Sequence, residues 1–213
     1  MISSHFLSTS SNLLIGVLLF LSQNTIMTKH RCGWCLGDPI YEAYHDEEWG
    51  VPLHEERLLF EFLILETFQA GLSWITVLKK RDNFRKAFDN FDYHLVAQYD
   101  QHKIDTLLQD PGIIRNKLKV NATVTNAKLF IALQQEFGSF DSYIWGFVNG
   151  KPIKNSWNNY KECPATTEIS DQISKDLKKR GFKFVGSTVI YAFMQAIGMV
   201  NDHEVDCFRY NQV

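Results

Sequence analysis

The sequence predicts one all-α domain, and three observations support this prediction. The chain has 213 residues, of which 45% are hydrophobic, and this is enough to build the core of a single domain. Apolar residues recur at helical spacing along most of the chain. Convincing strands, in which apolar and polar residues alternate, are absent. The sequence also has no internal repeat and no low-complexity segment.

The apolar pattern predicts three helices in the first two thirds of the chain. A wide apolar stripe runs from Arg57 to Gln69, and a shorter one covers residues 104–108. A longer helix should run through residues 127–137 and end at Gly138, because glycine is favoured just after a helix.

Two more helices are predicted in the C-terminal third. A helix capped by Ser170 or Asp171 should end at Gly181. The segment STVIYAFMQAIG, residues 187–198, predicts a last and mostly buried helix. Residues 149–167 have two prolines and little periodicity, so we expect them to form the only long loop.

Residues 1–26 differ in composition from the rest of the chain. They contain no Asp, Glu, Lys or Arg, and their apolar run NLLIGVLLFL is too short to cross a bilayer comfortably. A positive n-region and a small-residue cleavage site are both missing, which argues against a signal peptide. We therefore expect residues 1–26 to be an apolar extension outside the fold, with Met27 as the hypothetical start and residues 27–213 as the single domain. We expect no membrane partner.

The charge distribution leaves an anionic partner open. The net charge of −2 argues against a uniformly basic nucleic-acid binder, but the basic residues are grouped. Each group taken alone is best explained as a solvated helix face. The groups are Lys79, Lys80, Arg81, Arg85 and Lys86; Arg115, Lys117 and Lys119; and Lys175, Lys178, Lys179, Arg180 and Lys183.

The motif RCGWC, residues 31–35, has the spacing of a redox dithiol. A thioredoxin-like oxidoreductase needs a βαβ context after this motif, and the predicted helical chain has none. The four cysteines of the chain are too few for a disulfide scaffold. We therefore expect reduced thiols and a cytoplasmic location.

Cysteines and histidines near the two ends of the chain have the spacing of metal ligands. His203 and Cys207 are four residues apart, so both side chains can reach one point. His45 and one cysteine of RCGWC can supply two more ligands if the intervening segment loops back. Two thiolates and two imidazoles form a closed tetrahedral zinc shell, which is a structural site and would join the two ends of the domain. Spacing alone does not decide between Cys32 and Cys35.

The segment LLQDPGIIRNKLK predicts two helices joined by a tight turn. The first should end at Gln109 or one residue earlier, and the second should begin around residues 113–116. Because Gly112 has no Cβ, a sugar-phosphate backbone can approach the turn, and the free N–H groups that begin the second helix favour an anion. Arg115 and Lys117 follow at once. The alternative is a plain helix–helix turn.

Glu66 lies among apolar residues on its predicted helix. A buried carboxylate is costly unless it is paired, protonated or functional, whereas a glutamate at the boundary can keep its head in water. A carboxylate among aromatic rings suits a flat, cationic ligand held by stacking and a charged hydrogen bond. The aromatic residues nearest in sequence are Trp34, Tyr41, Tyr44, Trp49 and Trp74.

Five stretches together resemble the DNA-3-methyladenine glycosylase I family. They are RCGW…DPIYEAYHDEEWGVP, QAGLSWITVLKKR, GIIRNKLK, KKRGFKFVGSTVIYAFMQA and VNDHEVDC, in this order, and the likeness runs from about Arg31 to Cys207. The resemblance implies a helix-hairpin-helix DNA glycosylase-like bundle with one structural zinc ion that joins the N- and C-terminal segments. The zinc ligands would be Cys32, His45, His203 and Cys207.

The resemblance also implies a base site and an activity. The base-binding residues would be Trp34, Tyr41, Tyr44, Glu66 and Trp74. Leu72 would fill the gap left in the duplex, and Gly112, Arg115 and Lys117 would contact the DNA backbone. The expected reaction is base-excision repair of double-stranded DNA carrying alkylated bases. A monomer would flip out 3-methyladenine, hydrolyse its N-glycosidic bond and leave an abasic site. Glu66 would accept hydrogen bonds from the base and stabilise its charge.

The family resemblance further implies that the strand is not cleaved. Related enzymes that cut the strand carry a lysine four residues after the hairpin glycine, and this chain has Asn116 there. A catalytic aspartate expected further downstream has no clear match, with Asp141 as the nearest candidate. A zinc-stabilised DNA-binding module without chemistry remains the alternative, and the role of Glu66 discriminates between the two.

Overall fold

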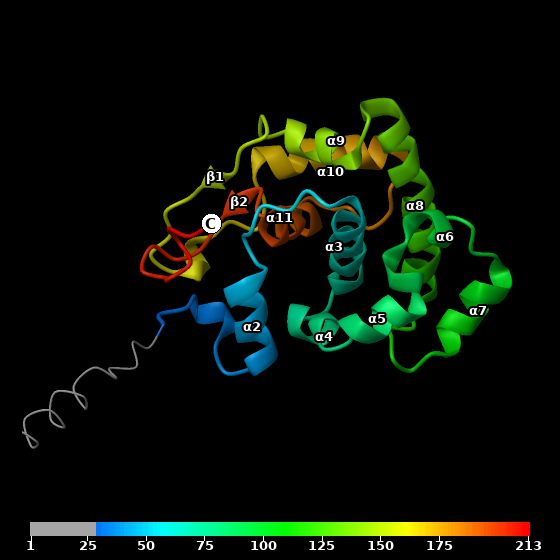
Figure 1. Ribbon diagram of the computed structural model, residues 1–213, viewed down its shortest axis with the longest axis horizontal. Helices are drawn as coiled ribbons and strands as arrows, with labels where there is room; N and C mark the ends of the chain where they lie inside the picture. The colour runs from blue at the N-terminus through cyan, green and yellow to red at the C-terminus, as the bar shows by residue number, and fades with distance from the viewer. Residues whose placement is uncertain (1–28) are drawn as a thin grey trace, which may run out of the picture.

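The structure is a computed structural model in which residues 29–213 are described, so the prediction about residues 1–26 lies outside the described residues. Figure 1 shows the helices and strands in space. In chain order they are η1 (Gly33–Cys35), α2 (Pro39–Glu47), α3 (Glu56–Gln69), α4 (Trp74–Leu78), α5 (Arg81–Ala87), η2 (Asp89–Phe91), α6 (Tyr93–Val96), α7 (Gln101–Gln109), α8 (Lys117–Phe137), α9 (Phe140–Gly146), β1 (Ile153–Lys154), η3 (Tyr160–Glu162), α10 (Glu168–Arg180), α11 (Ser187–Ala196) and β2 (Val200–Asn201).

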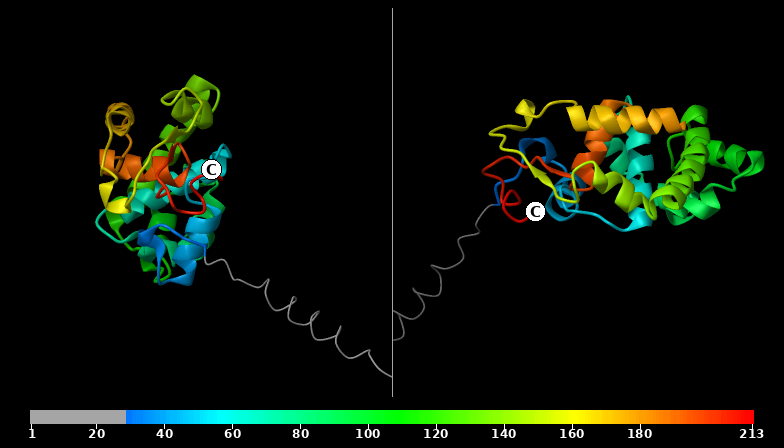
Figure 2. Two further views of the ribbon diagram at one scale, coloured as in Figure 1. Left: turned by 90° about the vertical axis from the view of Figure 1, so that its left-hand side faces the viewer. Right: turned by 90° about the horizontal axis from the view of Figure 1, so that it is seen from above.

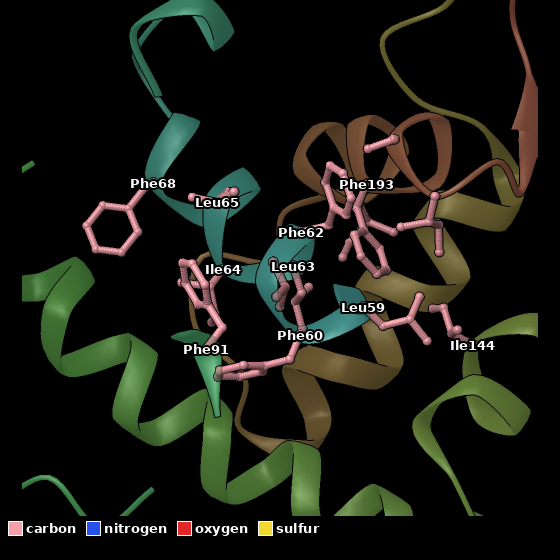
Figure 3. Close-up of a cluster of buried hydrophobic side chains, with 14 of the residues drawn as sticks. Leu59, Phe60, Phe62, Leu63, Ile64, Leu65, Phe68, Phe91, Ile144 and Phe193 are labelled. Carbon is pink, nitrogen blue, oxygen red and sulfur yellow. The ribbon is translucent and has the colours of Figure 1, made fainter. Parts of the chain in front are cut away.

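Helix α3 is the centre of the bundle. Its side chains are buried without interruption over residues 59–68, and a helix that is buried on every side must be covered by neighbours all round. Figure 3 shows the hydrophobic side chains among them pointing outward from α3, with Phe68 and Phe91 on one side and Phe193 of α11 and Ile144 of α9 on another. The carboxylate of Glu55 caps the start of α3 by accepting from two backbone N–H groups.

The helices around α3 divide the molecule into two ends. Helices α6, α7 and α8 lie at one end, and α2 with the strand pair lies at the other (Figure 1). The view from above shows the start of the described chain and its C-terminus together at the second end (Figure 2). The backbone N–H of Phe208 donates to the carbonyl of His30 at 2.9 Å, which joins these two segments directly.

The two strands are a short parallel pair. Ile153 faces Val200 in the register, and an isolated bridge between Trp157 and Glu204 continues the same alignment. The chain was predicted to be all-α, and strand residues are indeed confined to this pair within residues 29–213. Among the same residues, no helix combines the length and the apolar character that crossing a membrane requires.

The predicted helices are confirmed, with one correction to a cap. Gly138 and Gly181 end their helices at φ 86° and 104°, as expected for glycine in this position. The start of α10, however, was placed too late. Thr167 is its N-cap, and Ser170 is the third helical residue of a capping box in which each hydroxyl accepts from the other residue's backbone N–H.

Candidate functional site

A cavity of about 230 Å³ lies where α2, α3, α4 and α11 meet. All five predicted base-binding residues line it, together with residues from η3 and from the segment after β2. The lining residues are Trp34, Tyr41, Tyr44, Trp49, Glu66, Gln69, Trp74, Tyr160, Cys163, Ala192, Gln195 and Asp202. The fold therefore brings together side chains that are far apart in the sequence.

The aromatic side chains form a wall of interlocking rings. Trp34 meets Tyr41 and Trp49 edge to face at centroid distances of 4.8 and 4.9 Å, and Tyr44 packs at 5.5 Å from Trp74. The indole N–H groups of Trp34 and Trp74 are buried and have no hydrogen-bond partner within the described part of the chain. A bound group with acceptor atoms would satisfy these donors.

Glu66 lies on the last turn of α3 with only 4% of its surface exposed. Burial is the cause that raises its pKa to about 8, with no hydrogen bond or charge of the described residues opposing it. The carboxyl group is therefore mostly protonated at neutral pH. A cation placed beside it would favour the carboxylate and lower this pKa, so the site is suited to a positively charged ligand.

The four predicted metal ligands converge at the end of the molecule where the two termini meet. Their donor atoms all lie within 4.8 Å of one another, and all four residues are buried. The Cys32 and Cys207 sulfurs lie 3.5 and 3.6 Å from Nδ1 of His203, and the Cys207 sulfur lies 3.4 Å from Nε2 of His45. A tetrahedral zinc ion places sulfur and nitrogen ligands about 3.6 Å apart, so the donor set fits zinc.

Neighbouring groups orient both histidines. Nδ1 of His45 lies 2.9 Å from Oδ1 of Asp46, whose carboxylate is held by a two-pronged contact from Arg31 at 2.8 Å. Nε2 of His203 lies 3.2 Å from the carbonyl oxygen of Trp49. These contacts fix the ring nitrogens that face the sulfurs, as the outer contacts of metal ligands do.

Cys35 is not part of this cluster. Its thiol donates to the carbonyl of Cys32 at 3.2 Å, and both residues are free thiols rather than a disulfide. The structure therefore separates the two cysteines of RCGWC, and Trp34 between them faces the cavity.

Asp202 and Glu204, which flank His203, are buried carboxylates beside the candidate sites, and the sequence did not single them out. The Asp202 carboxylate receives hydrogen bonds from five side chains, namely Asn155, Trp157, Cys163, Tyr191 and Gln195. Glu204 accepts from the backbone N–H groups of Gly33 and Tyr160 at 3.2 and 2.9 Å. Two carboxylates beside His203 in NDHE were the available signal for a buried polar network.

The residues predicted to contact the DNA backbone lie in the loop between α7 and α8 and at the first position of α8. Arg115 and Lys117 are exposed, and Asn116 caps α8 by accepting from the N–H of Lys119 at 3.2 Å. Gly112 is half-buried, and its N–H is taken by Asp110 at 2.7 Å. A Cβ on Gly112 would lie 2.9 Å from that carboxylate and 3.2 Å from Asn83, so internal packing also requires glycine here.

Much of the first basic group is used inside the fold. Arg81 is buried and pairs with Glu48 and Glu61 at 2.6 Å, and Arg85 also contacts Glu61. Lys80 donates to the carbonyls of the turn between α7 and α8 at 3.1 and 3.2 Å. These residues bond to other parts of the fold, so the explanation of this group as a solvated helix face is wrong for them.

Two further candidates from the sequence lie elsewhere. Leu72 is 40% exposed, on the turn between α3 and α4. Asp141, the nearest candidate for the downstream aspartate, lies in the first turn of α9, pairs with His54 at 2.8 Å and does not line the cavity, which agrees with the expectation that this aspartate has no clear match.

Comparison with known proteins places this chain among DNA glycosylases. The family model described as methyladenine glycosylase matches residues 34–210. The DNA-3-methyladenine glycosylase 1 of Escherichia coli (strain K12) is 50% identical over 180 residues, which cover 84% of this chain and 96% of the relative.

Two solved structures agree closely. A crystal structure of 3-methyladenine DNA glycosylase I has a TM-score of 0.82 and 49% identity, covering 84% of this chain and 98% of the other. A tyrosine-to-phenylalanine variant of such an enzyme, in complex with 3-methyladenine, has a TM-score of 0.81 and 37% identity, covering 84% and 96%. The chain belongs to the methyladenine glycosylase family.

Proposed function

We propose that this protein excises 3-methyladenine from alkylated double-stranded DNA by hydrolysing its N-glycosidic bond. The observation that carries the proposal is that Glu66 is buried in a cavity walled by aromatic rings and has no hydrogen-bond partner within residues 29–213. A related enzyme has been solved in complex with the same base. Release of the free base would leave an abasic site, the first intermediate of base-excision repair.

The cavity suits the charge of the alkylated base. Methylation at N3 gives adenine a positive charge and weakens its glycosidic bond, so strong general-acid help is less necessary. In the proposed complex, Trp74 and Tyr41 hold the ring, and Glu66 accepts hydrogen bonds from its polar edge with Tyr44 as a second polar contact. The cation would convert Glu66 to its carboxylate, and the displaced proton would leave to solvent. Water would then attack C1′.

The base reaches the cavity only after it has been flipped out of the duplex. Unstacking costs a few kcal/mol, less for a damaged base, and an inserted side chain offsets part of this cost. Leu72 is exposed on its turn close to cavity residues Gln69 and Trp74. We assign Leu72 as the inserted side chain. The α7–α8 segment would act as a helix-hairpin-helix, with Gly112, Arg115 and Lys117 along the DNA backbone.

One structural zinc ion per chain completes the proposal. Cys32, His45, His203 and Cys207 would hold it, and its chemistry would be to close a four-coordinate shell that ties the N-terminal segment to the C-terminal one. We place the enzyme as a monomer in the bacterial cytosol, where the thiols stay reduced and chromosomal DNA is present.

The proposed enzyme does not cleave the DNA strand. Asn116 takes the place of a lysine nucleophile, and its side chain is engaged as the N-cap of α8. Borohydride reduction during the reaction should therefore trap no covalent protein–DNA adduct. A trapped adduct would contradict this part of the proposal.

Incubation of the purified protein with methylated DNA, followed by chromatography of the released bases, tests the activity. We expect 3-methyladenine to be released by the native protein and much more slowly by Glu66→Gln. Glu47→Gln, which removes an exposed carboxylate of α2, is the matched control and should retain the native rate. Binding of alkylated DNA without release of any base would favour a binding module. Release of 7-methylguanine without 3-methyladenine would indicate a broader alkylbase glycosylase.

A further inference from the structure

Lys119 is a buried lysine that forms no ion pair with a carboxylate of residues 29–213. It lies on the first turn of α8, is 4% exposed, and donates from Nζ to the carbonyl oxygens of Phe68 and Ala70 at 2.8 and 2.6 Å. Burial lowers its pKa. A buried ammonium group needs hydrogen-bond acceptors. These carbonyls lie at the C-terminal end of α3, where carbonyl groups have no backbone N–H of the same helix to accept from.

Phe68 and Ala70, whose carbonyls accept from Lys119, directly precede the turn on which Leu72 is exposed. The N–H of Leu72 donates to the carbonyl of Gln69 at 2.6 Å, and the Gln69 side chain donates back to the carbonyl of Leu72 at 2.7 Å. Gly71 has φ 83°, which glycine adopts without strain. The leucine therefore projects from a closed turn whose base is fixed by the lysine.

The backbone of the same lysine is fixed to the loop between α7 and α8. Its N–H is the one that Asn116 caps. Lys80, just after α4, also reaches across to the carbonyls of Pro111 and Gly112. The Leu72 turn and the 110–117 loop are thus joined through short polar contacts, although about 40 residues separate them in the chain.

We propose that Lys119 is a positioning residue that holds the Leu72 turn in fixed register with the 110–117 loop. This inference rests on the proposed function. When the loop grips the DNA backbone, Leu72 is then already aimed at the base stack, and insertion needs no separate ordering of its turn. An inserted side chain that is misplaced by about 1 Å loses much of its effect, which is why the register matters.

The proposal predicts a defect that is specific to duplex DNA. Lys119→Met keeps the length of the stem and removes the donors. We expect its single-turnover rate of base release from duplex DNA to fall on the order of ten- to a hundredfold. Release from single-stranded DNA carrying the same lesion should change little, because no base stack has to be opened. Binding of free 3-methyladenine, followed by tryptophan fluorescence, should be unchanged. Lys128→Met, an exposed lysine on the same helix, is the control.

A double-mutant cycle separates positioning from a general effect on the fold. If Lys119 acts through the turn, Lys119→Met should add little to the defect of Leu72→Ala, and the duplex losses should be far from additive. Additive losses, or equal losses on duplex and single-stranded DNA, would overturn the inference. Lys119→Gln provides the same comparison if the methionine variant does not fold. A native protein that releases no base refutes the proposed function itself, whereas a native duplex rate in Lys119→Met refutes only this inference.

Discussion

Glu66→Gln should change how the stability of the protein depends on pH. Burial raises the pKa of Glu66 from 4.5 to about 8, so between these values the folded protein keeps a proton that the unfolded chain has lost. Each rise in pH through this window therefore favours the unfolded state. The contribution of Glu66 to stability therefore becomes less favourable from pH 4.5 upward, and this change is complete above pH 8.

The size of the effect follows from the shift. One pKa unit corresponds to about 1.4 kcal/mol, so the shift from 4.5 to about 8 amounts to about 5 kcal/mol of free energy of unfolding. Glutamine has the shape of the protonated glutamate and carries no charge at any pH. The variant should match the native protein near pH 4.5 and exceed it by several kcal/mol at pH 9.

Urea unfolding of both proteins at a series of pH values measures the difference. Other titrating groups, including the metal ligands, are common to the two proteins and cancel in the comparison. The difference should grow by about 1.4 kcal/mol per pH unit within the window. Glu47→Gln, which removes an exposed carboxylate of α2, is the control variant. Parallel stability curves for native and Glu66→Gln proteins would refute the assignment of Glu66 as a buried, partnerless acid.

Three further changes test other parts of the structure. Cys32→Ser should lose bound zinc and Cys35→Ser should keep it, as measured by elemental analysis; equal metal contents would contradict the ligand set. Gly198→Ala should lower the free energy of unfolding by more than about 3 kcal/mol in urea, because φ is 72° and the new Cβ would lie 2.4 Å from the backbone of Val51. Trp74→Ala should weaken binding of free 3-methyladenine by about 1–3 kcal/mol in calorimetry, and unchanged affinity would exclude stacking on this ring.

The sequence was sufficient to predict the elements that local patterns determine. Helix α3 was predicted by its apolar residues, and α8 and α10 end at the glycines that were named, because helical spacing and the left-handed cap are properties of neighbouring residues. The structure also brings the four candidate metal ligands to one point and the five candidate base-binding residues to one cavity, although their roles stay predictions.

What the sequence did not predict depends on contacts between distant segments. Lys119 was grouped with the exposed basic residues, yet it is buried against α3. The spacing of residues within α8 does not indicate which other helix α8 packs against. The residues around Asp202 form no pattern that predicts its burial or the five side chains that donate hydrogen bonds to it. Spacing alone likewise left the choice between Cys32 and Cys35 open; the family resemblance named Cys32, and the structure places Cys32 in the cluster.

The segment around His203 is extended, and this restricts insertions and deletions of residues next to it. Neighbouring side chains of an extended chain point to opposite sides, so His203 faces the sulfurs of Cys32 and Cys207. Asp202 instead lines the cavity, and Glu204 accepts from the backbone N–H groups of Gly33 and Tyr160. Deletion or insertion of a single residue just before this segment would exchange the two sides. A carboxylate would then lie beside the sulfurs of Cys32 and Cys207, and an imidazole would take the place of Asp202 in the cavity lining. Substitutions can alter the two sites separately, but a shift in register would damage both at once.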